Sequence, residues 1–222
     1  MRIYLILISF FVFTSCSKYD YQWLSIGDSI TWQNGRPYKY GAIAKGYQHQ
    51  FILHQKKSIK LENKGFSGLP LTGSETSVYS ELENFNFKNH NLITIFVGTN
   101  DFRLNKPIKS ADSLNSFKYC LSILIRKIKN QNPNAKIYLL TPLQRDKDGY
   151  DISYTNSVGL TLNDYRNEIL HIGKTTNTPV IDLYNESGIT TQNLSKFTLD
   201  GLHPNDAGYK MIAKTLLKYI AL

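Results

Sequence analysis

Three residues whose side chains can act together in nucleophilic catalysis stand near opposite ends of the sequence. Ser29 lies in the stretch LSIGDSIT, residues 24–31, and Asp200 and His203 lie in the stretch DGLHP, which ends at Pro204. A serine hydroxyl is a weak nucleophile at neutral pH, so it needs a neighbouring base. His203 can accept its proton, and Asp200 can hold the imidazole in the required tautomer and stabilise the imidazolium. These residue types predict attack by Ser29 on a carbonyl carbon.

Attack on a carbonyl also requires hydrogen-bond donors that face the oxyanion of the tetrahedral intermediate. The backbone N–H groups of Ser29 and Gly68 and the side-chain amide of Asn100 can supply three such donors. Gly65 occurs in the same stretch as Gly68, NKGFSG, and is an alternative to it. Each stretch alone is also typical of an ordinary turn, so the prediction depends on their joint occurrence.

The hydrophobic pattern predicts the elements that would bring these residues together. Short apolar runs occupy residues 23–26, 59–63, 92–97, 136–140 and 179–183. The third run, LITIFV, is apolar along its whole length, which is typical of a strand covered on both faces. Strands that alternate with helices predict a parallel sheet wrapped by helices. Ligands bind outside the carboxyl ends of such strands, so Ser29, Gly68, Asn100, Asp200 and His203 are expected to converge on one edge.

Stretches with helical spacing lie between these runs. The expected buried helix faces comprise Ile43, Ala44, Tyr47 and Phe51, and then residues within 114–128, 162–172 and 205–220. Asp112 and Asn205 are expected to be N-caps. The polar segment 144–158 is expected to be a long loop, and such loops in compact domains often carry function.

Four stretches together resemble the sequence blocks of the SGNH hydrolase superfamily, also called the GDSL esterases and lipases. They are GDS at 27–29, SG at 67–68, GTND at 98–101 and DGLHP at 200–204. The resemblance extends over residues 24–220, and its SG context favours Gly68 over Gly65. The Gly-x-Ser-x-Gly stretch of the α/β-hydrolases does not occur in the sequence.

The resemblance implies an α/β fold, a three-layer α/β/α sandwich with a five-stranded parallel sheet, which is the flavodoxin-like SGNH hydrolase fold. It implies ester hydrolysis through an acyl-serine intermediate, without a metal or a cofactor. Ser29, Asp200 and His203 would be the catalytic residues. Ser29, Gly68 and Asn100 would form the oxyanion hole.

Three residues directly follow two of these blocks, Trp32 after the serine block and Phe102 and Arg103 after GTND. They are interpreted either as loop packing or as substrate contacts, with aromatic rings against the face of a sugar. The histidines other than His203 are interpreted as surface or helix-face residues, because none has ligand-type partners nearby in sequence.

The first 16 residues are interpreted as a lipoprotein-type signal peptide, and residues 17–222 as one SGNH hydrolase domain. MRIYLILISFFVFTSC has one early charge, an apolar run from Ile3 to Phe13 and small residues before Cys16. The run is too short to span a bilayer comfortably, since that takes about 20 apolar residues. FTSC resembles a bacterial lipobox, in which the cysteine is lipidated. No acidic residue directly follows Cys16, as in outer-membrane lipoproteins of Gram-negative bacteria; the alternative is an ordinary signal peptide and a periplasmic or secreted protein.

Composition restricts the classes of function. The chain has 222 residues, 41% of them hydrophobic, which suits one folded domain. Its formal net charge of +9 comes from 26 basic and 17 acidic residues. The basic residues are dispersed, which favours solvated faces over nucleic-acid binding. The two cysteines, Cys16 and Cys120, indicate no disulfide framework or zinc site, and Cys120 is expected in the core.

The expected function is that of a serine esterase, with a small-molecule or polysaccharide ester as substrate. The preferred interpretation is a carbohydrate O-acetylesterase that acts on polysaccharide and is anchored to a membrane through Cys16. Aromatic residues suited to sugar stacking occur in the loops near the site: Trp32, Tyr38, Tyr40, Tyr150 and Tyr154. One alternative is a lysophospholipase or short-chain lipid esterase, and an alternative of another class is a non-catalytic glycan-binding lipoprotein. The latter has no need of Ser29, Asp200 and His203 together.

Overall fold

A sheet of five parallel strands forms the centre of the computed structural model, which describes residues 18–39, 41–73 and 75–222. The strands are β1 (Tyr21–Gly27), β2 (Ile59–Gly65), β3 (Leu92–Phe96), β4 (Lys136–Leu140) and β7 (Val180–Ile181). Their order across the sheet is β2-β1-β3-β4-β7, and every neighbouring pair is parallel. This is the flavodoxin-like strand order, so the predicted parallel sheet is confirmed.

The central strands are buried because their side chains point alternately into two hydrophobic clusters. In β3, Ile93 and Ile95 belong to the cluster on one face of the sheet, and Leu92 and Phe96 belong to the cluster on the other. All five residues of β3 are buried. A strand with core on both faces is mostly apolar, which explains why LITIF lacks the alternation of a half-exposed strand. Its buried polar residue, Thr94, accepts a hydrogen bond from the Trp23 indole N–H at 3.0 Å.

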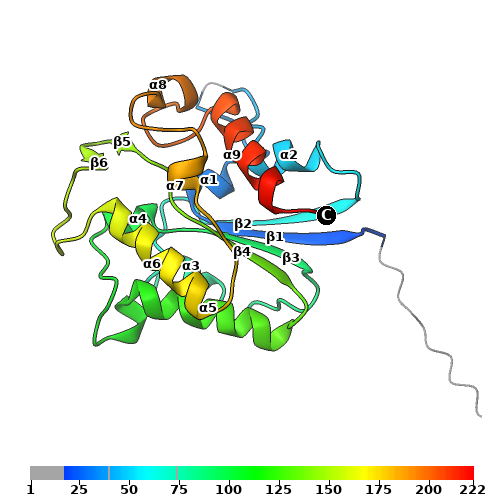
Figure 1. Ribbon diagram of the computed structural model, residues 1–222, viewed down its shortest axis with the longest axis horizontal. Helices are drawn as coiled ribbons and strands as arrows, with labels where there is room; N and C mark the ends of the chain where they lie inside the picture. The colour runs from blue at the N-terminus through cyan, green and yellow to red at the C-terminus, as the bar shows by residue number, and fades with distance from the viewer. Residues whose placement is uncertain (1–17, 40, 74) are drawn as a thin grey trace, which may run out of the picture.

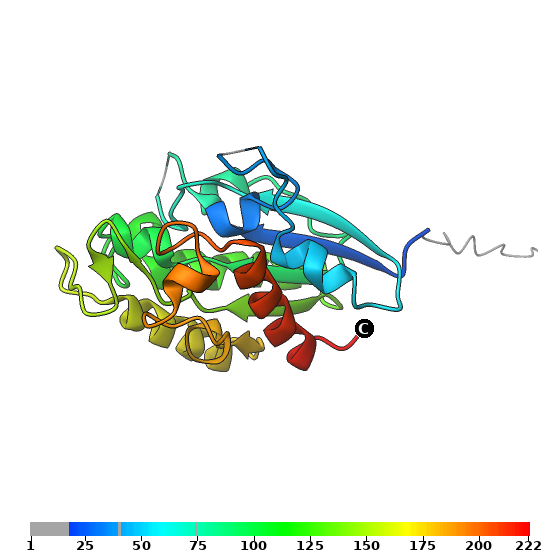
Figure 2. The same ribbon diagram turned by 90° about the horizontal axis from the view of Figure 1, so that it is seen from above.

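Helices cover both faces of the sheet and complete the predicted three-layer sandwich. The helices of the described residues are α1 (Ser29–Trp32), α2 (Tyr47–Ile52), α3 (Val78–Glu81), α4 (Thr99–Arg103), α5 (Phe117–Gln131), α6 (Leu162–Thr175), α7 (Leu183–Glu186), α8 (Leu194–Phe197) and α9 (Asp206–Tyr219), with a 3-10 helix at Ser113–Asn115. The helices α3, α5 and α6 contribute to the cluster on one face, and α2 and α9 to the cluster on the other (Figure 1). The views in Figure 1 and Figure 2 both show α9 beside α2.

The helix that follows α1 begins later than its hydrophobic spacing predicts. Helix α2 begins at Tyr47, and Ile43, which was expected on its buried face, is 57% exposed. Ile43 instead forms an isolated antiparallel bridge with Pro37. Gly41 lies between them with φ = 96°, a left-handed conformation that glycine adopts readily, so the chain turns back here instead of coiling.

Both predicted N-cap residues cap a helix, but Asp112 caps a short 3-10 helix and not a long α-helix. The Asn205 side chain accepts a hydrogen bond from the Gly208 N–H and caps α9, as predicted. The Asp112 side chain caps the 3-10 helix Ser113–Asn115 instead, and Ser116 is the N-cap of α5. Among the residues that the structure describes, no helix is long and apolar enough to cross a membrane.

Candidate active site

Ser29 is the first residue of α1 and directly follows the turn at the end of β1. The Asp28 side chain accepts a hydrogen bond from the Ile30 N–H at 2.9 Å and so caps this helix. Gly27 must be small, because a Cβ atom there would lie 2.2 Å from the Thr31 Oγ1 atom. The sequence GDS therefore places the serine in a tight turn at the carboxyl end of a central strand.

The side chains of Ser29, His203 and Asp200 form one continuous hydrogen-bonded chain. Ser29 Oγ lies 3.0 Å from His203 Nε2, and His203 Nδ1 lies 2.8 Å from Asp200 Oδ2. Because one imidazole nitrogen faces the carboxylate, the other is free to act on the serine proton. The structure thus brings together residues 174 positions apart in the sequence, as their types predicted.

The turn that carries Asp200 and His203 is fixed by its own hydrogen bonds. Asp200 Oδ1 accepts from the His203 N–H at 2.8 Å and from the Leu202 N–H at 3.2 Å. Leu199 donates its N–H to the His203 carbonyl at 2.8 Å, next to the bridge between Thr198 and Pro204. One carboxylate oxygen therefore holds the backbone while the other faces the imidazole.

The segment expected to be a loop, residues 144–158, contains a short antiparallel hairpin of β5 (Asp146–Lys147) and β6 (Tyr150–Asp151). Its two turn residues, Asp148 and Gly149, have φ of 57° and 78°. Positive φ at both positions is typical of the tight turns that connect antiparallel strands. The Asp146 N–H donates to the Gly201 carbonyl at 2.9 Å, so the base of the hairpin contacts the turn that carries Asp200 and His203.

Lys147 in this hairpin contacts the candidate catalytic carboxylate, a partner that the sequence did not predict. Its Nζ atom lies 2.6 Å from Asp200 Oδ2. Partial burial pushes the pKa of Asp200 upward, but hydrogen bonds from Lys147 and from the His203 backbone and side chain outweigh it. The pKa of Asp200 is therefore well below its usual range, and the carboxylate is charged throughout the neutral range.

Of the two candidate oxyanion glycines, Gly68 lies at the site and Gly65 does not. Gly68 lines the same pocket as Ser29 and has φ = 79°, which favours glycine. Gly65 pairs with β1, its N–H donates to Asn63 Oδ1 at 2.9 Å, and a Cβ atom there would lie 2.2 Å from the Trp32 backbone nitrogen. Gly65 thus has a packing role, and the geometry favours Gly68 as the donor.

Asn100 lies in α4 with its side-chain amide beside the segment that follows Gly68. Its Nδ2 atom donates one proton to the Leu69 carbonyl at 3.0 Å, and an amide nitrogen carries a second proton. The next residue, Asp101, accepts from the Leu71 N–H at 2.9 Å. Its burial raises the pKa to about 6. Asp101 therefore joins the Gly68 segment to α4 and keeps Gly68 and Asn100 in register.

A pocket of about 220 Å³ surrounds these groups. It is lined by Ser29, Ser67, Gly68, Asn100, Arg103, Arg145, Lys147, Asp148, Leu202 and His203. Leu202 contributes the one apolar side chain of this lining. The pocket is thus small, and most of the side chains that line it carry polar or charged groups.

The three expected substrate contacts have different positions. Arg103 lines the pocket. Phe102 is fully buried and packs edge-to-face against Tyr150 and Tyr165, so its interpretation as a substrate contact is wrong and the packing alternative holds. Trp32 is half-buried outside the pocket lining, with the guanidinium carbon of Arg36 at 4.6 Å from its ring centroid.

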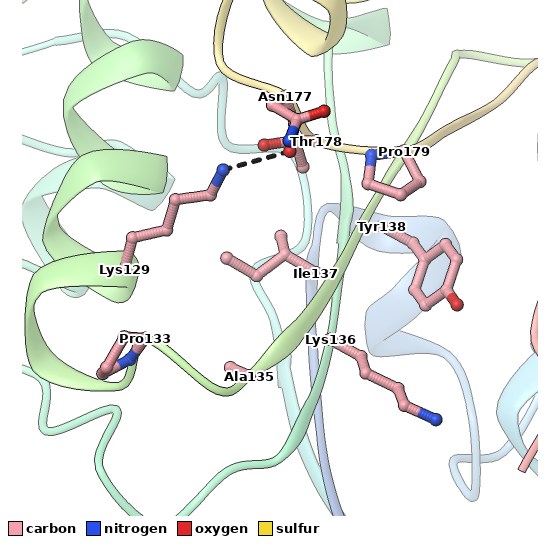
Figure 3. A pocket seen from close by; sticks show the side chains of 9 residues that line it. All are labelled: Lys129, Pro133, Ala135, Lys136, Ile137, Tyr138, Asn177, Thr178 and Pro179. Carbon is pink, nitrogen blue, oxygen red and sulfur yellow. Dashed lines mark hydrogen bonds between the residues drawn. The ribbon is translucent and has the colours of Figure 1, made fainter.

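A second hollow, of about 270 Å³, lies at the amino ends of β4 and β7 (Figure 3). Ser29 follows the carboxyl end of the parallel strand β1, so this hollow is at the other end of the strands. Lys129 reaches across it and donates to the Asn177 carbonyl at 3.2 Å. No thiol, carboxylate or imidazole belongs to its described lining.

Two further residues of reactive types, a cysteine and a histidine, lie outside the pocket lining. Cys120 is free and buried in the core, and burial raises the pKa of its thiol to about 12, as expected of a packing residue. His90 is buried and contacts Glu62 at 2.9 Å, so it is not the surface residue that its sequence context indicated. The described residues contain no group of three or more His, Cys, Asp or Glu side chains that could hold a metal ion.

Comparison with known proteins agrees with this geometry. A family model described as the GDSL-like Lipase/Acylhydrolase family matches residues 25–211. A search of curated proteins finds no significant match.

Solved structures match over nearly the whole chain. A possible lipase from Chitinophaga pinensis is 26% identical, with a TM-score of 0.69 over 90% of this chain and 97% of its own. A protein from Lactobacillus plantarum is 22% identical, with a TM-score of 0.76 over 90% and 95%. An acetylxylan esterase from Geobacillus stearothermophilus is 20% identical, with a TM-score of 0.64 over 91% and 95%. The last two similarities concern the fold.

Proposed function

This chain belongs to the GDSL-like Lipase/Acylhydrolase family and is a carboxylic ester hydrolase, and on that premise we propose that Ser29, Asp200 and His203 are its catalytic residues. Ser29 Oγ attacks the ester carbonyl carbon while His203 Nε2 takes the hydroxyl proton. The negative charge that develops on the carbonyl oxygen is stabilised by the N–H groups of Ser29 and Gly68 and by the Asn100 amide. His203 then gives the proton to the leaving alcohol, and an acyl-serine remains.

A water molecule then hydrolyses the acyl-serine in a second attack of the same kind. His203 takes a proton from the attacking water, the oxyanion forms again, and its collapse releases the acid and returns the proton to Ser29 Oγ. Asp200 stays ionised throughout and stabilises the imidazolium in both halves. No group other than these side chains and water is needed to balance the protons.

The observation that carries this proposal is the continuous contact from Ser29 Oγ through His203 to Asp200. We expect Ser29→Ala to lose nearly all turnover of p-nitrophenyl acetate and to keep the melting temperature, because the hydroxyl faces a pocket. Ser67→Ala is a matched control, since Ser67 lines the same pocket on the exposed segment before Gly68. Substantial turnover in purified Ser29→Ala would refute the assignment.

We further propose that the substrate is an O-acetylated carbohydrate. A pocket of about 220 Å³ with polar lining suits an acetyl group on a sugar better than a long acyl chain, which needs an apolar channel. The acetylxylan esterase of similar fold gives this proposal a precedent for the scaffold. The alternative, a lysophospholipase or short-chain lipid esterase, would prefer longer chains.

A series of p-nitrophenyl esters from acetyl to dodecanoyl separates these alternatives. The proposal predicts a steep fall in kcat/KM beyond acetyl, because a pocket of about 220 Å³ with one apolar side chain has little room and little apolar surface for added methylenes. A maximum at long chains would replace the carbohydrate proposal by the lipid one and leave the catalytic residues unaffected.

We also propose that Cys16, which lies outside the described residues, is lipidated and anchors the protein to the outer membrane. The support is the resemblance of FTSC to a lipobox. Metabolic labelling with a fatty acid should mark the wild type and not Cys16→Ala. Absence of label on the wild type would reject the anchor.

A further inference from the structure

The pocket around Ser29 is lined by three cationic side chains, Arg103, Arg145 and Lys147, against one acidic side chain, Asp148. This excess lies within the lining itself and is distinct from the dispersed basic residues of the whole surface. Lys147 forms a salt bridge with Asp200, so its positive charge is already paired with a carboxylate. The two arginines require a separate explanation.

Neither guanidinium forms a salt bridge with any carboxylate of the described residues. Arg145 donates to uncharged acceptors, with Thr99 Oγ1 at 2.9 Å and the Tyr150 carbonyl at 3.1 Å. Among the described residues, the Arg103 guanidinium has one hydrogen-bond acceptor, Asn100 Oδ1, at a long distance of 3.5 Å. Arg145 is fully buried, whereas Arg103 is half-buried and can reach a ligand.

The local acidic groups compensate these charges incompletely. Burial and then the nearby charge of Arg103 lower the pKa of Arg145, which shows that the two cations repel each other, while Asp28, Asp148 and Asp200 oppose that effect. Burial raises the pKa of Asp28 to about 7, so it carries only part of a charge at neutral pH. Asp200 is bound by Lys147 and His203. Two adjacent cations in a half-buried pocket favour the binding of an anion.

Building on the proposed function, we propose that Arg103 binds an anionic group, a carboxylate or a sulfate, on the sugar that bears the acetyl ester. The planar guanidinium matches the two oxygens of such a group. Arg145, which is fully buried beside the same pocket, adds to the positive potential. The enzyme would therefore be selective for acidic carbohydrates, and Arg103 would be a specificity-determining residue.

The test compares three sugars acetylated at the same hydroxyl: methyl galactoside, methyl galacturonoside and methyl galactoside 6-sulfate. We expect the wild type to favour an acidic sugar at least tenfold in kcat/KM at low ionic strength, a difference of about 1.4 kcal/mol. The preferred acid distinguishes carboxylate from sulfate. Arg103→Met should bring the ratio near one, and Arg103→Lys should keep part of it. The ratio of acidic to neutral sugar is the readout, because it cancels any change in rate that is common to all three esters.

Arg126→Met is the matched control, because Arg126 is exposed on α5 and its loss changes the net charge equally. It should keep the full preference for the acidic sugar. A wild-type ratio near one, or a ratio that survives Arg103→Met, would overturn the proposal.

Equilibrium binding separates this proposal from the proposed function. Titration calorimetry with Ser29→Ala measures affinity for the three acetylated sugars without turnover. Tighter binding of an acidic sugar, lost when Arg103→Met is added, supports the anion site even if no ester is hydrolysed. Equal affinities, or no binding of either acidic sugar, overturn it even if hydrolysis is confirmed.

Discussion

At the scale of single residues, Asn100 is expected to affect the rate more than the fold. Its side chain donates one hydrogen bond to the Leu69 carbonyl, and its second amide proton is available to an oxyanion. We expect Asn100→Ala to lower kcat by about 10²–10³-fold, as for other oxyanion donors. The free energy of unfolding should fall by only about 1–2 kcal/mol, the cost of one lost buried hydrogen bond. Steady-state kinetics and urea unfolding measure both, and an unchanged kcat would remove Asn100 from the oxyanion hole.

Asp28, in contrast to Asn100, is expected to affect the fold more than the rate, because its buried carboxyl makes the free energy of unfolding depend on pH. Burial raises its pKa from 3.8 to about 7, so the folded protein binds more protons than the unfolded chain between these values. The free energy of unfolding therefore decreases as pH rises through this window, and the cost is complete above pH 7. Asp28→Asn keeps an oxygen for the Ile30 N–H and removes the charge.

We expect the free energy of unfolding of Asp28→Asn to exceed that of the wild type at pH 8 and to approach it at pH 4. The difference between the two pH values should be on the order of 3 kcal/mol by linkage. Urea unfolding of both proteins at several pH values measures it. A difference that stays constant with pH would contradict the buried, protonated state of Asp28.

At the scale of elements, the contact between the β5–β6 hairpin and the turn carrying Asp200 and His203 depends on a single glycine. Gly201 has φ = 81°, and a Cβ atom there would lie 2.0 Å from the Asp146 carbonyl oxygen. Gly149 has a similar φ of 78° but open space around it. Alanine substitutions at Gly201 and Gly149 therefore separate the effect of steric overlap from that of backbone strain.

Gly149→Ala should cost about 1–2 kcal/mol of stability, the strain of a left-handed non-glycine residue, and leave kcat/KM nearly unchanged. Gly201→Ala should cost more and also lower kcat/KM by about 10²-fold, because the overlap displaces Asp200 and His203 from Ser29. Thermal unfolding and ester hydrolysis measure both variants. Equal kinetics in the two would show that the hairpin does not position the turn.

The sheet could be predicted from the sequence because its strands are encoded locally, as uninterrupted apolar runs such as LITIFV. The hairpin at 146–151 had one local signal, the Asp148–Gly149 pair, which is typical of tight hairpin turns. Its flanking residues are too polar to read as strands, since they pair at the surface rather than in the core. Ile43 illustrates the reverse case, where helical spacing was present but the turn at Gly41 prevented the helix.

The candidate site could be predicted in part for the same reason. Ser29, Gly68, Asn100, Asp200 and His203 stand in short stretches with their own pattern, and the structure brings them together; their roles stay predictions. Arg145 and Lys147 have no such pattern, because only the tertiary contact of the hairpin with Asp200 gives them a position. Phe102 follows the pattern directly, yet its ring faces the core because that side of α4 packs against Tyr165.

At the scale of the whole molecule, two helices far apart in the sequence, α1 and α9, contact each other beside the site. Tyr209 in α9 donates its hydroxyl to the Ile30 carbonyl at 3.1 Å, just behind Ser29. Helix α9 also packs beside α2 on the cluster that includes Tyr47 and Leu216. Loss of α9 packing is therefore expected to separate His203 from Ser29, so that activity and the global fold are lost together.

Leu216→Ala tests this coupling at a position remote from the pocket. Leu216 is fully buried near the end of α9, so its truncation should lower the free energy of unfolding by about 2–5 kcal/mol. The urea midpoints of fluorescence and of activity should shift down by the same amount, while kcat of the folded enzyme in water stays unchanged. Lys214→Ala, an exposed change on the same helix, should shift neither midpoint. Loss of activity at a lower urea concentration than loss of fluorescence would mean that the Asp200–His203 turn opens on its own, independently of the sheet that joins it to Ser29.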